Sequence, residues 1–206
     1  MAMKYLEMMM TKSVLRAQQQ YYGHSANITD APERDLLGEG EAEFLTDRDS
    51  FYLSTVSETG WPYVQHRGGP KGFLRLLNPS TLVFADYQGN RQLLRTGNLS
   101  VDDRVSLFLM DYPNRARLKI LGHARVEDAR LHPDLAAQLA NPGMKARVER
   151  IVFINVVSFD WNCPKYITPR YSLEEVEGLV GPLKARVAML EAELKAAKAV
   201  SGKSAT

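Results

Sequence analysis

Trp61-Pro-Tyr-Val-Gln-His-Arg-Gly-Gly-Pro70 decides the fold, together with a second stretch, Trp161-Asn-Cys-Pro-Lys-Tyr-Ile-Thr-Pro-Arg170. The first stretch reads as a strand that runs into a basic, glycine-rich corner. The second reads as the exit of a strand, and it carries an indole, an amide, a thiol and an arginine. A corner of this kind can hold an anion, and an indole can cover a flat ring. The two stretches together suggest a phosphorylated planar cofactor, with flavin mononucleotide (FMN) as the candidate.

Short segments on either side of these stretches alternate apolar with small or polar residues and are rich in aromatic and β-branched side chains. This pattern is typical of strands. Because only short helices separate them, the segments indicate a closed or nearly closed antiparallel barrel and not a βαβ sheet. We expect a mainly β fold with peripheral helices and six antiparallel strands. The expected strands are residues 50–57, 61–66, 81–87, 105–112, 117–126 and 150–161, with a shorter apolar piece at 73–77.

The last part of the chain has a different pattern. Ser172-Leu-Glu-Glu175 is a capping box, and apolar residues then recur at spacings of three and four, as in the a/d seam of a coiled coil. We expect Pro182 to kink or restart this helix. The helix either lies on its own barrel or packs on a partner subunit. The seam consists of Leu173, Val176, Val180, Leu183, Val187, Leu190 and Leu194.

These patterns predict three parts: an N-terminal helical segment and loop (1–49), a barrel that binds the cofactor (50–171) and a C-terminal helix (172–206). Short helices are expected at residues 13–22, 41–48 and 132–140, with one or two helical turns at 91–96.

Composition narrows the class of protein. The 206 residues are 45% hydrophobic and 24% charged, as in an ordinary globular protein, and the net charge of +2 is too small to indicate a nucleic-acid or membrane partner. Cys163 is the single cysteine, so no intrachain disulfide can form, which fits a reducing compartment. No apolar run approaches the roughly 20 residues that span a bilayer, and the methionine-rich start lacks the features of a signal peptide. We therefore expect a cytoplasmic protein.

Two basic turns are candidates for binding the cofactor phosphate. Arg67 lies at a strand end beside Gly68 and Gly69, whose N–H groups are sterically unshielded. The segment 89–92 follows another strand and places Arg91 in the first turn of a short helix, an arrangement that suits phosphate. Each of these segments alone is more often a plain turn. Further candidates for binding the cofactor are Asp86, Asn90 and Gln92.

The ring of a flavin requires hydrogen-bond donors of its own. Negative charge develops on its pyrimidine side on reduction, so donors near that side favour reduction. Gln65 and His66, near the end of their strand, are candidates, and His66 is also a weak candidate for proton transfer. Arg117 and Lys119 share one face of their strand, where Lys119 is expected to be an exposed charge. Trp161, next to Asn162, is a candidate cover for the ring, although a lone Trp at a strand end is more often a core residue.

Other chemistry finds little support in the sequence. Cys163 has no obvious base near it in the sequence and is expected to be a free structural thiol. His24, His66, His123 and His132 are scattered without the spacing of metal ligands, so no metal site is predicted.

Four motifs in order make the chain resemble the pyridoxamine 5′-phosphate oxidase-like flavoproteins, in particular a branch with His-Arg-Gly-Gly-Pro and Trp-Asn-Cys-Pro motifs. Beside the two opening stretches, they are FADYQGNRQ (84–92) and LFLMDYPNRARLKILGHARV (107–126). The similarity covers residues 50–170 and extends to an N-terminal helix. It implies an FMN-binding split β-barrel.

The resemblance also implies a homodimer with two FMN molecules at the subunit interface. Arg67 and residues 90–92 would hold the phosphate and ribityl chain from one subunit, while Trp161 and Arg170 would approach the flavin from the other. Arg117 stands where the oxidase proper has a glutamine beside the ring. The chain departs from the oxidase at Gln92, where the oxidase has a lysine, and in continuing past Arg170, which puts a vitamin B6 phosphate substrate in doubt.

The first functional hypothesis is therefore an FMN-dependent oxidoreductase of unknown substrate. The alternatives are a flavin-binding or sensing protein with little turnover, and a split barrel that uses deazaflavin or haem. A nucleic-acid-binding barrel is the least favoured, because the charge is near neutral.

Overall fold

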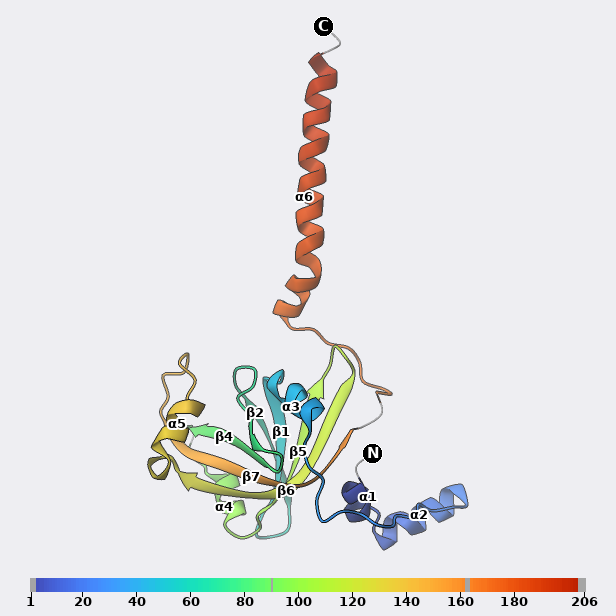
Figure 1. Ribbon diagram of the computed structural model, residues 1–206, viewed down its shortest axis with the longest axis vertical. Coiled ribbons are helices and arrows are strands. Elements are labelled where there is room, and N and C mark those ends of the chain that lie inside the picture. Colours follow the sequence, from blue (N-terminus) through green and yellow to red (C-terminus); the bar gives the residue numbers. More distant parts are fainter. Residues whose placement is uncertain (1–2, 90, 162–163, 204–206) are drawn as a thin grey trace. The chain divides into compact units, whose positions relative to one another are not determined.

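One antiparallel sheet of seven strands follows the alternation in the sequence (Figure 1). The computed structural model describes residues 3–89, 91–161 and 164–203, leaving out the side chains of 196–197 and 199–203. The fold is mainly β with peripheral helices and is a split barrel. The strands are β1 (Ser50–Val56), β2 (Pro62–Gly68), β3 (Arg75–Asn78), β4 (Thr81–Tyr87), β5 (Arg104–Asp111), β6 (Ala116–Asp128) and β7 (Val148–Trp161).

The strand count is seven, where the sequence predicts six. The additional strand is the four-residue β3, which pairs with β4 through a short turn at residues 78–81. It lies at the short apolar piece expected at 73–77. A piece of this length cannot be distinguished from a loop by alternation alone, because it contains barely two periods of the strand repeat. Its pairing with β4 makes it a strand.

The hydrogen-bonded order of the strands is β2-β1-β5-β6-β7-β4-β3. β1 and β4 are therefore separated by three other strands. The rings of Phe51 on β1 and Phe84 on β4 nevertheless lie 5.4 Å apart, centroid to centroid. The sheet must curl to bring them together, so β1 and β4 face each other across one interior.

Short helices flank the sheet, and four of the five lie within a few residues of their predicted positions. They are α1 (Met3–Met9), α2 (Lys12–Tyr22), α3 (Glu39–Thr46), α4 (Leu94–Leu99) and α5 (Pro133–Leu139), with a 3₁₀ turn at Ala129–Leu131. Only α1 has no counterpart among the expected helices. Thr11 caps α2, because the Thr11 hydroxyl accepts the N–H of Val14. Gly23 ends α2 in the left-handed conformation.

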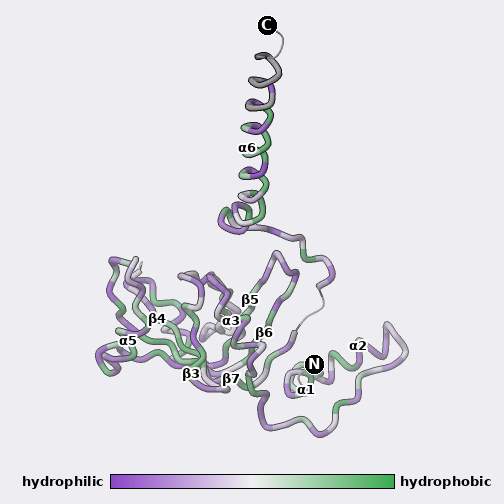
Figure 2. The backbone as a smooth tube through the Cα atoms, turned by 45° about the horizontal axis from the view of Figure 1, so that its top comes forward, coloured by the Kyte–Doolittle hydropathy of each residue, from purple (hydrophilic) through white to green (hydrophobic). Residues whose placement is uncertain are grey.

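The chain divides into two compact units. The first comprises residues 1–111 and 115–166, and the second comprises 112–114 and 167–206. The second unit contains α6 (Leu173–Lys203), along which hydrophobic and hydrophilic residues alternate (Figure 2). The predicted capping box is present, since the Ser172 hydroxyl accepts the N–H of Glu175, whose carboxylate in turn accepts the N–H of Ser172. None of the described helices is long and apolar enough to cross a membrane.

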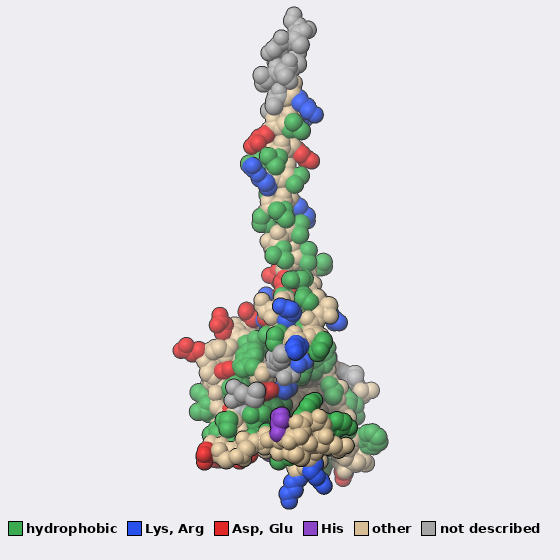
Figure 3. All heavy atoms as spheres, turned by 90° about the vertical axis from the view of Figure 1, so that its right-hand side faces the viewer, with side chains coloured by type: hydrophobic (Ala, Val, Ile, Leu, Met, Phe, Trp, Pro, Cys, Tyr) green, Lys and Arg blue, Asp and Glu red, His purple; other side chains and the backbone are tan. Residues whose placement is uncertain are grey.

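Pro182 lies inside α6 and does not restart it. The residue before it is Gly181, which has no Cβ to clash with the proline ring, so the helical conformation is tolerated there. Proline inside a helix costs about 3 kcal/mol and glycine about 1 kcal/mol relative to alanine. Apolar side chains lie along the surface of this helix (Figure 3), among them Leu183, which is 65% exposed. The intrinsic helix propensity is therefore weak around residues 178–182, whereas residues 183–198 are rich in the good helix formers Ala, Leu, Lys and Glu. Most of the apolar side chains described along α6 stay exposed.

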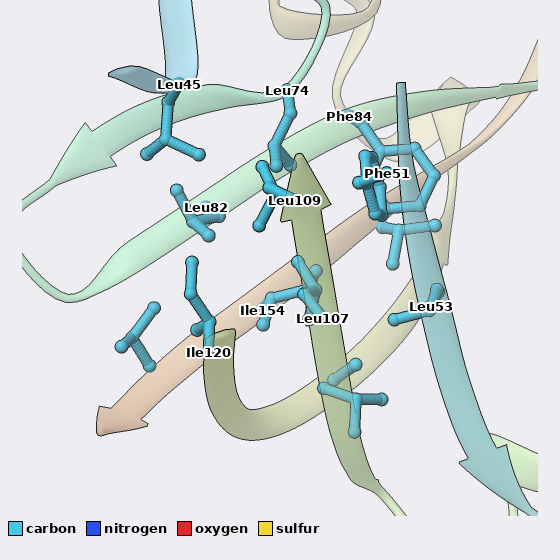
Figure 4. Packing of buried hydrophobic residues seen from close by; sticks show 14 of the residues in the cluster. Leu45, Phe51, Leu53, Leu74, Leu82, Phe84, Leu107, Leu109, Ile120 and Ile154 are labelled. Carbon is cyan, nitrogen blue, oxygen red and sulfur yellow. The ribbon is translucent and has the colours of Figure 1, made fainter. Parts of the chain in front are cut away.

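The barrel interior is filled by aliphatic and aromatic side chains from five strands (Figure 4). Leu107 on β5, Ile120 on β6 and Ile154 on β7 are fully buried and belong to the same cluster as Phe51 and Phe84. Burial alternates along β5, as the period of two predicts. The core thus fixes the positions of β4 and β7, and β2 is held by its pairing with β1; residues of these three strands build the site.

One tight contact inside the sheet depends on the absence of a side chain. Gly122 lies on β6 where its register with β7 shifts, and a Cβ added there would be 2.4 Å from the carbonyl oxygen of Asn155. Replacement by any other residue would force the two strands apart.

We predict that Gly122→Ala lowers the free energy of unfolding by about 1–3 kcal/mol, because the added methyl group overpacks this contact. Gly40→Ala is the matched control: it lies in α3, and a Cβ added at this position would have no other atom within 4 Å. It should leave stability unchanged or raise it by up to about 1 kcal/mol. Urea unfolding measures both, and equal stabilities of the two variants would contradict the prediction.

Candidate functional site

The carboxylate of Asp86 binds three guanidinium groups at the open side of the barrel. Arg67 Nη2 lies 2.9 Å from Asp86 Oδ1, while Arg95 Nη2 and Arg150 Nε lie 2.8 Å and 2.9 Å from Oδ2. Asp86 comes from β4, and its partners come from β2, α4 and β7. We call these four residues the Asp86 cluster.

Each member of the Asp86 cluster is placed by a regular element. Asp86 and Arg150 are direct cross-strand partners in the register of β4 with β7. Arg67 lies at the end of β2, a strand that does not pair with β4, so its ion pair crosses the gap in the barrel. Arg95 lies in α4, and its guanidinium and that of Arg67 lie near the ring of Phe84, at 5.6 Å and 5.4 Å from its centroid.

Burial makes the electrostatics of the Asp86 cluster strong. Asp86 is 6% exposed and Arg95 is 5% exposed. Burial alone raises the pKa of Asp86, but the charges and hydrogen bonds of the arginines outweigh it and hold the pKa below the ordinary 3.8. Burial lowers the pKa of Arg95, and so do the positive charges of Arg67 and Arg150, against the opposing attraction of Asp86. The guanidinium groups are thus crowded around a single carboxylate.

Arg95 has unused donors. Among the described residues, no acceptor lies within hydrogen-bonding distance of its Nε or Nη1 atoms, although both are buried. A buried donor without a partner costs free energy and is uncommon in native proteins, so these two atoms are candidates for binding an acceptor that enters the cavity.

A cavity of about 540 Å³ opens over the Asp86 cluster. Four guanidinium groups and two carboxylates are among the described side chains that line it, which leaves two positive charges unbalanced. The fourth guanidinium belongs to Arg91 and the second carboxylate to Glu149, which also pairs with Arg150 at 3.1 Å. The polar and aromatic lining further includes Tyr63, Gln65, Tyr87, Gln92 and Thr96.

The loop that carries Arg91 has an unusual backbone. Arg91 and Leu93 both have positive φ, at 62° and 52°, a region that non-glycine residues seldom adopt. Such conformations collect at ligand sites, where surrounding structure holds them. Here they place Arg91 on the cavity immediately before α4 begins.

Alternation along β2 separates the candidates predicted there. Gln65 and Arg67 lie on one face and line the cavity, whereas His66 lies on the opposite face, exposed, with its ring 5.6 Å from that of Tyr52. Gly68 and Gly69 line a second, neighbouring cavity of about 230 Å³. The N–H of Gly69 donates to the carbonyl of Asp49 at 2.9 Å, so this donor already has an acceptor within the chain.

The remaining candidates lie outside this cavity. Trp161 donates its indole N–H to Glu41 at 2.6 Å and packs edge-on against Phe44 of α3. Arg117 is partly buried on β6, opposite Met110. The guanidinium of Arg170 lies over the ring of Tyr112, inside the second unit.

Three predicted positions lie outside the described residues: Asn90, Asn162 and Cys163. Lys119, predicted as an exposed charge, is instead partly buried and pairs with Asp160 at 2.9 Å. No group of three or more His, Cys, Asp or Glu side chains in the described part of the chain is arranged to hold a metal ion.

Arg95 and Arg150 are site residues that the sequence analysis did not predict. Arg150 could have been found by pairing the predicted strands 81–87 and 150–161, because Asp86 and Arg150 then face each other. For Arg95 the signal is weaker: it is a single cation in the sequence Leu-Leu-Arg-Thr, and only the packing of α4 shows that it is buried.

Comparison with known proteins assigns the family. Residues 37–152, more than half of the chain, match the family model described as pyridoxamine 5′-phosphate oxidase. The chain belongs to this family. The Asp86 cluster and Arg91 lie inside the matched region of this pyridoxamine 5′-phosphate oxidase family member. Among the curated proteins, none matches the chain.

Solved structures similar to this family member are distant in sequence. A putative pyridoxamine 5′-phosphate oxidase from Lactobacillus delbrueckii is 21% identical, with 61% of this chain and 94% of that chain covered and a TM-score of 0.47. HupZ of Group A Streptococcus is 12% identical, with coverages of 66% and 100% and a TM-score of 0.47. An FMN-binding protein from Syntrophomonas wolfei is 13% identical, with coverages of 60% and 85% and a TM-score of 0.45.

We predict that Asp86→Asn destabilises the fold by about 3 kcal/mol or more, because it leaves buried guanidinium groups without their counter-charge. Asp128→Asn is the control: Asp128 and Arg130 form a surface ion pair, in which their side chains are 39% and 77% exposed, and Asn keeps an oxygen that can accept the N–H of Arg130, so this change should have little effect. Urea unfolding at neutral pH measures both variants, and equal losses would contradict this account of the cluster.

The loss of stability caused by Asp86→Asn should depend on pH. Because the folded-state pKa of Asp86 lies below 3.8, the unfolded chain takes up this proton first as the pH falls. The stabilisation is therefore complete above pH 3.8 and is lost as the pH falls through the lower folded-state value. The stability difference between wild type and Asp86→Asn should shrink below pH 3.8, and a difference that does not change with pH would contradict this.

Proposed function

We propose that the protein is an FMN-dependent oxidoreductase that works as a homodimer, with its cofactor at the subunit interface. The observation that carries the proposal is the surplus of two positive charges on the cavity over the Asp86 cluster. The membership of the pyridoxamine 5′-phosphate oxidase family supports it. The substrate is unassigned, and we retain the cytoplasm as the proposed location.

The residues of this cavity fit a phosphate monoester. Such a group carries about −1.5 to −2 charges at neutral pH, which matches the surplus on the cavity. Its oxygens only accept hydrogen bonds, and guanidinium groups only donate them, often two at once. Asp86 reduces the repulsion among Arg67, Arg95 and Arg150, but its single negative charge cannot balance all three. The remaining positive charge makes the cavity suitable for an anion.

We assign roles to the chain's residues on that basis. Arg67 and Arg91, together with Gln92, would hold the phosphate and the ribityl chain. Asp86, which is buried and already binds three arginines, would orient them and would not contact the anion itself. Gln65, on the cavity face of β2, would donate to the flavin ring.

The second subunit would complete the site. Trp161 and Arg170 are proposed to approach the flavin from the partner, as the family resemblance implies, and Arg117 to lie near the ring. Bound FMN would supply hydride or electron transfer between a donor and an acceptor. His66 stays a weak candidate for proton transfer, reachable only from the face of β2 opposite Gln65.

A flavin-binding or sensing role with little turnover is the second candidate. The described lining of the cavity holds four arginines that suit a cofactor phosphate, yet no histidine. This composition favours binding over proton transfer. Deazaflavin and haem are the alternative ligands, and the absorption spectrum of freshly purified protein separates both from FMN.

We predict that Arg67→Ala and Arg91→Ala each reduce the FMN content of purified protein and leave its fold intact. Each variant removes one of the cations proposed to hold the phosphate, and a lost charged hydrogen bond weakens binding by about 1.5–3 kcal/mol, or roughly ten-fold or more. Absorbance at flavin and protein wavelengths measures occupancy. Arg104→Ala is the control, since Arg104 is exposed and outside the cavity. Full occupancy in both cavity variants would show that the phosphate site is misplaced.

Turnover distinguishes the oxidoreductase from the binding protein. We expect the flavin of the loaded protein to be reduced by a nicotinamide nucleotide and to reduce an acceptor repeatedly, compared with a control without donor. Absence of turnover with every electron donor tried would favour the binding role.

A further inference from the structure

The apolar seam of α6 has the spacing of a coiled coil along its described length. When Leu173 is assigned to heptad position a, the other a positions are Val180, Val187 and Leu194, and the d positions are Val176, Leu183 and Leu190. Most of these side chains are exposed, for example Leu190 at 45% and Leu194 at 56% (Figure 3). An exposed apolar stripe of this regularity needs a partner of matching spacing.

The helix breakers in α6 all lie away from this stripe. Gly178, Gly181, Pro182 and Gly202 occupy positions f, b, c and b, on the outer side of a coiled coil. The sequence thus keeps the weakest helix formers off the seam. An isolated helix is marginal in water even where its residues are good helix formers, so packing along the seam would stabilise α6.

We propose that α6 pairs with α6 of a second copy of this chain as a parallel, in-register, two-stranded coiled coil. The central heptads carry Val180 and Val187 at a, with Leu183 and Leu190 at d. Valine at a combined with leucine at d favours two parallel strands over larger assemblies.

The charges beside the seam select the same arrangement. In a parallel, in-register pair, a residue at g faces the e residue five positions later on the other helix. Arg186 at g then meets Glu191 of the partner subunit, and Glu193 at g meets Lys198 of the partner subunit. Both pairs are attractive, and each occurs twice in the symmetric dimer.

These charge pairs do not have the spacing of ion pairs within one helix. Residues five apart point about 140° away from each other around a helix, because each residue turns it by about 100°. Arg186 and Glu191 therefore cannot contact each other within one α6. Any energetic coupling between them must come from a neighbouring helix, and a second copy supplies the complementary charge.

Cysteine cross-linking tests the pairing in the full-length chain. In a Cys163→Ser background, Leu190→Cys places one thiol at a seam position that meets its own copy only when the helices are parallel and in register. Ala185→Cys is the matched control at position f, exposed on the outer side of the same helix. We expect Leu190→Cys to form a disulfide-linked dimer at least about ten-fold faster than Ala185→Cys under mild oxidation, since the paired helices hold its thiols at high effective concentration.

Equal cross-linking rates at the two positions would overturn the proposal, whether α6 lies on its own barrel or stays single. Circular dichroism of each variant verifies that the helix is intact. The readout does not use flavin, so its failure would leave the proposed cofactor site unaffected.

Charge exchange gives a second test of the register. Added to the Leu190→Cys variant, Arg186→Glu should slow cross-linking, because it faces Glu191 of the partner subunit with a like charge. Adding Glu191→Arg to that protein should restore the original rate. Restoration supports the parallel pairing, whereas a further decrease or no recovery would contradict it.

Discussion

The buried carboxylate of Asp86 is the contact on which the site depends. It binds guanidinium groups from β2, α4 and β7. Of these elements only β7 is a sheet neighbour of β4, whereas β2 does not pair with β4 and α4 lies outside the sheet. Arg67 reaches Asp86 across the gap between β2 and β4, so the ion pair orients Arg67 on the cavity, while the edge-to-face contact of Phe51 with Phe84 holds the interior together. The geometry of the cavity follows from this single acceptor.

The charge of the cavity follows from the same contact. One carboxylate cannot neutralise three guanidinium groups, and burial prevents water from doing so at Arg95, whose Nε and Nη1 atoms find no acceptor among the described residues. A fold that only needed to close its barrel would be served better by a neutral pair, because unpaired buried charge is costly. The surplus of positive charge on the cavity is what a dianionic ligand requires. Arg91 adds to this charge and is held at the cavity by a loop of unusual backbone conformation. No described residue of the helix α6 lines this cavity. We propose that its exposed apolar seam packs against α6 of a second copy of the chain.

Much of the fold could be predicted from the sequence, because period-two alternation along strands such as β5 is a direct result of a one-sided core. The short strand β3 has too few residues for that signal. The site was predicted less completely. Arg67 and Arg91 could be found because they flank glycine-rich turns, but strand register is not visible in one sequence, so the pairing of Asp86 with Arg150 and the burial of Arg95 were missed. Alternation also places Gln65 and His66 on opposite faces of β2, although they are adjacent in the sequence.

Titration of the cofactor-free wild-type protein with FMN and with riboflavin tests the central claim most directly, because the two ligands differ only in the phosphate. If the Asp86 cluster and Arg91 form a phosphate site, FMN should bind at least about a hundred-fold more tightly, as expected for two charge-assisted hydrogen bonds. The preference should weaken with rising salt. Equal affinity for the two ligands would contradict the account, since it would show that these arginines do not bind the phosphate.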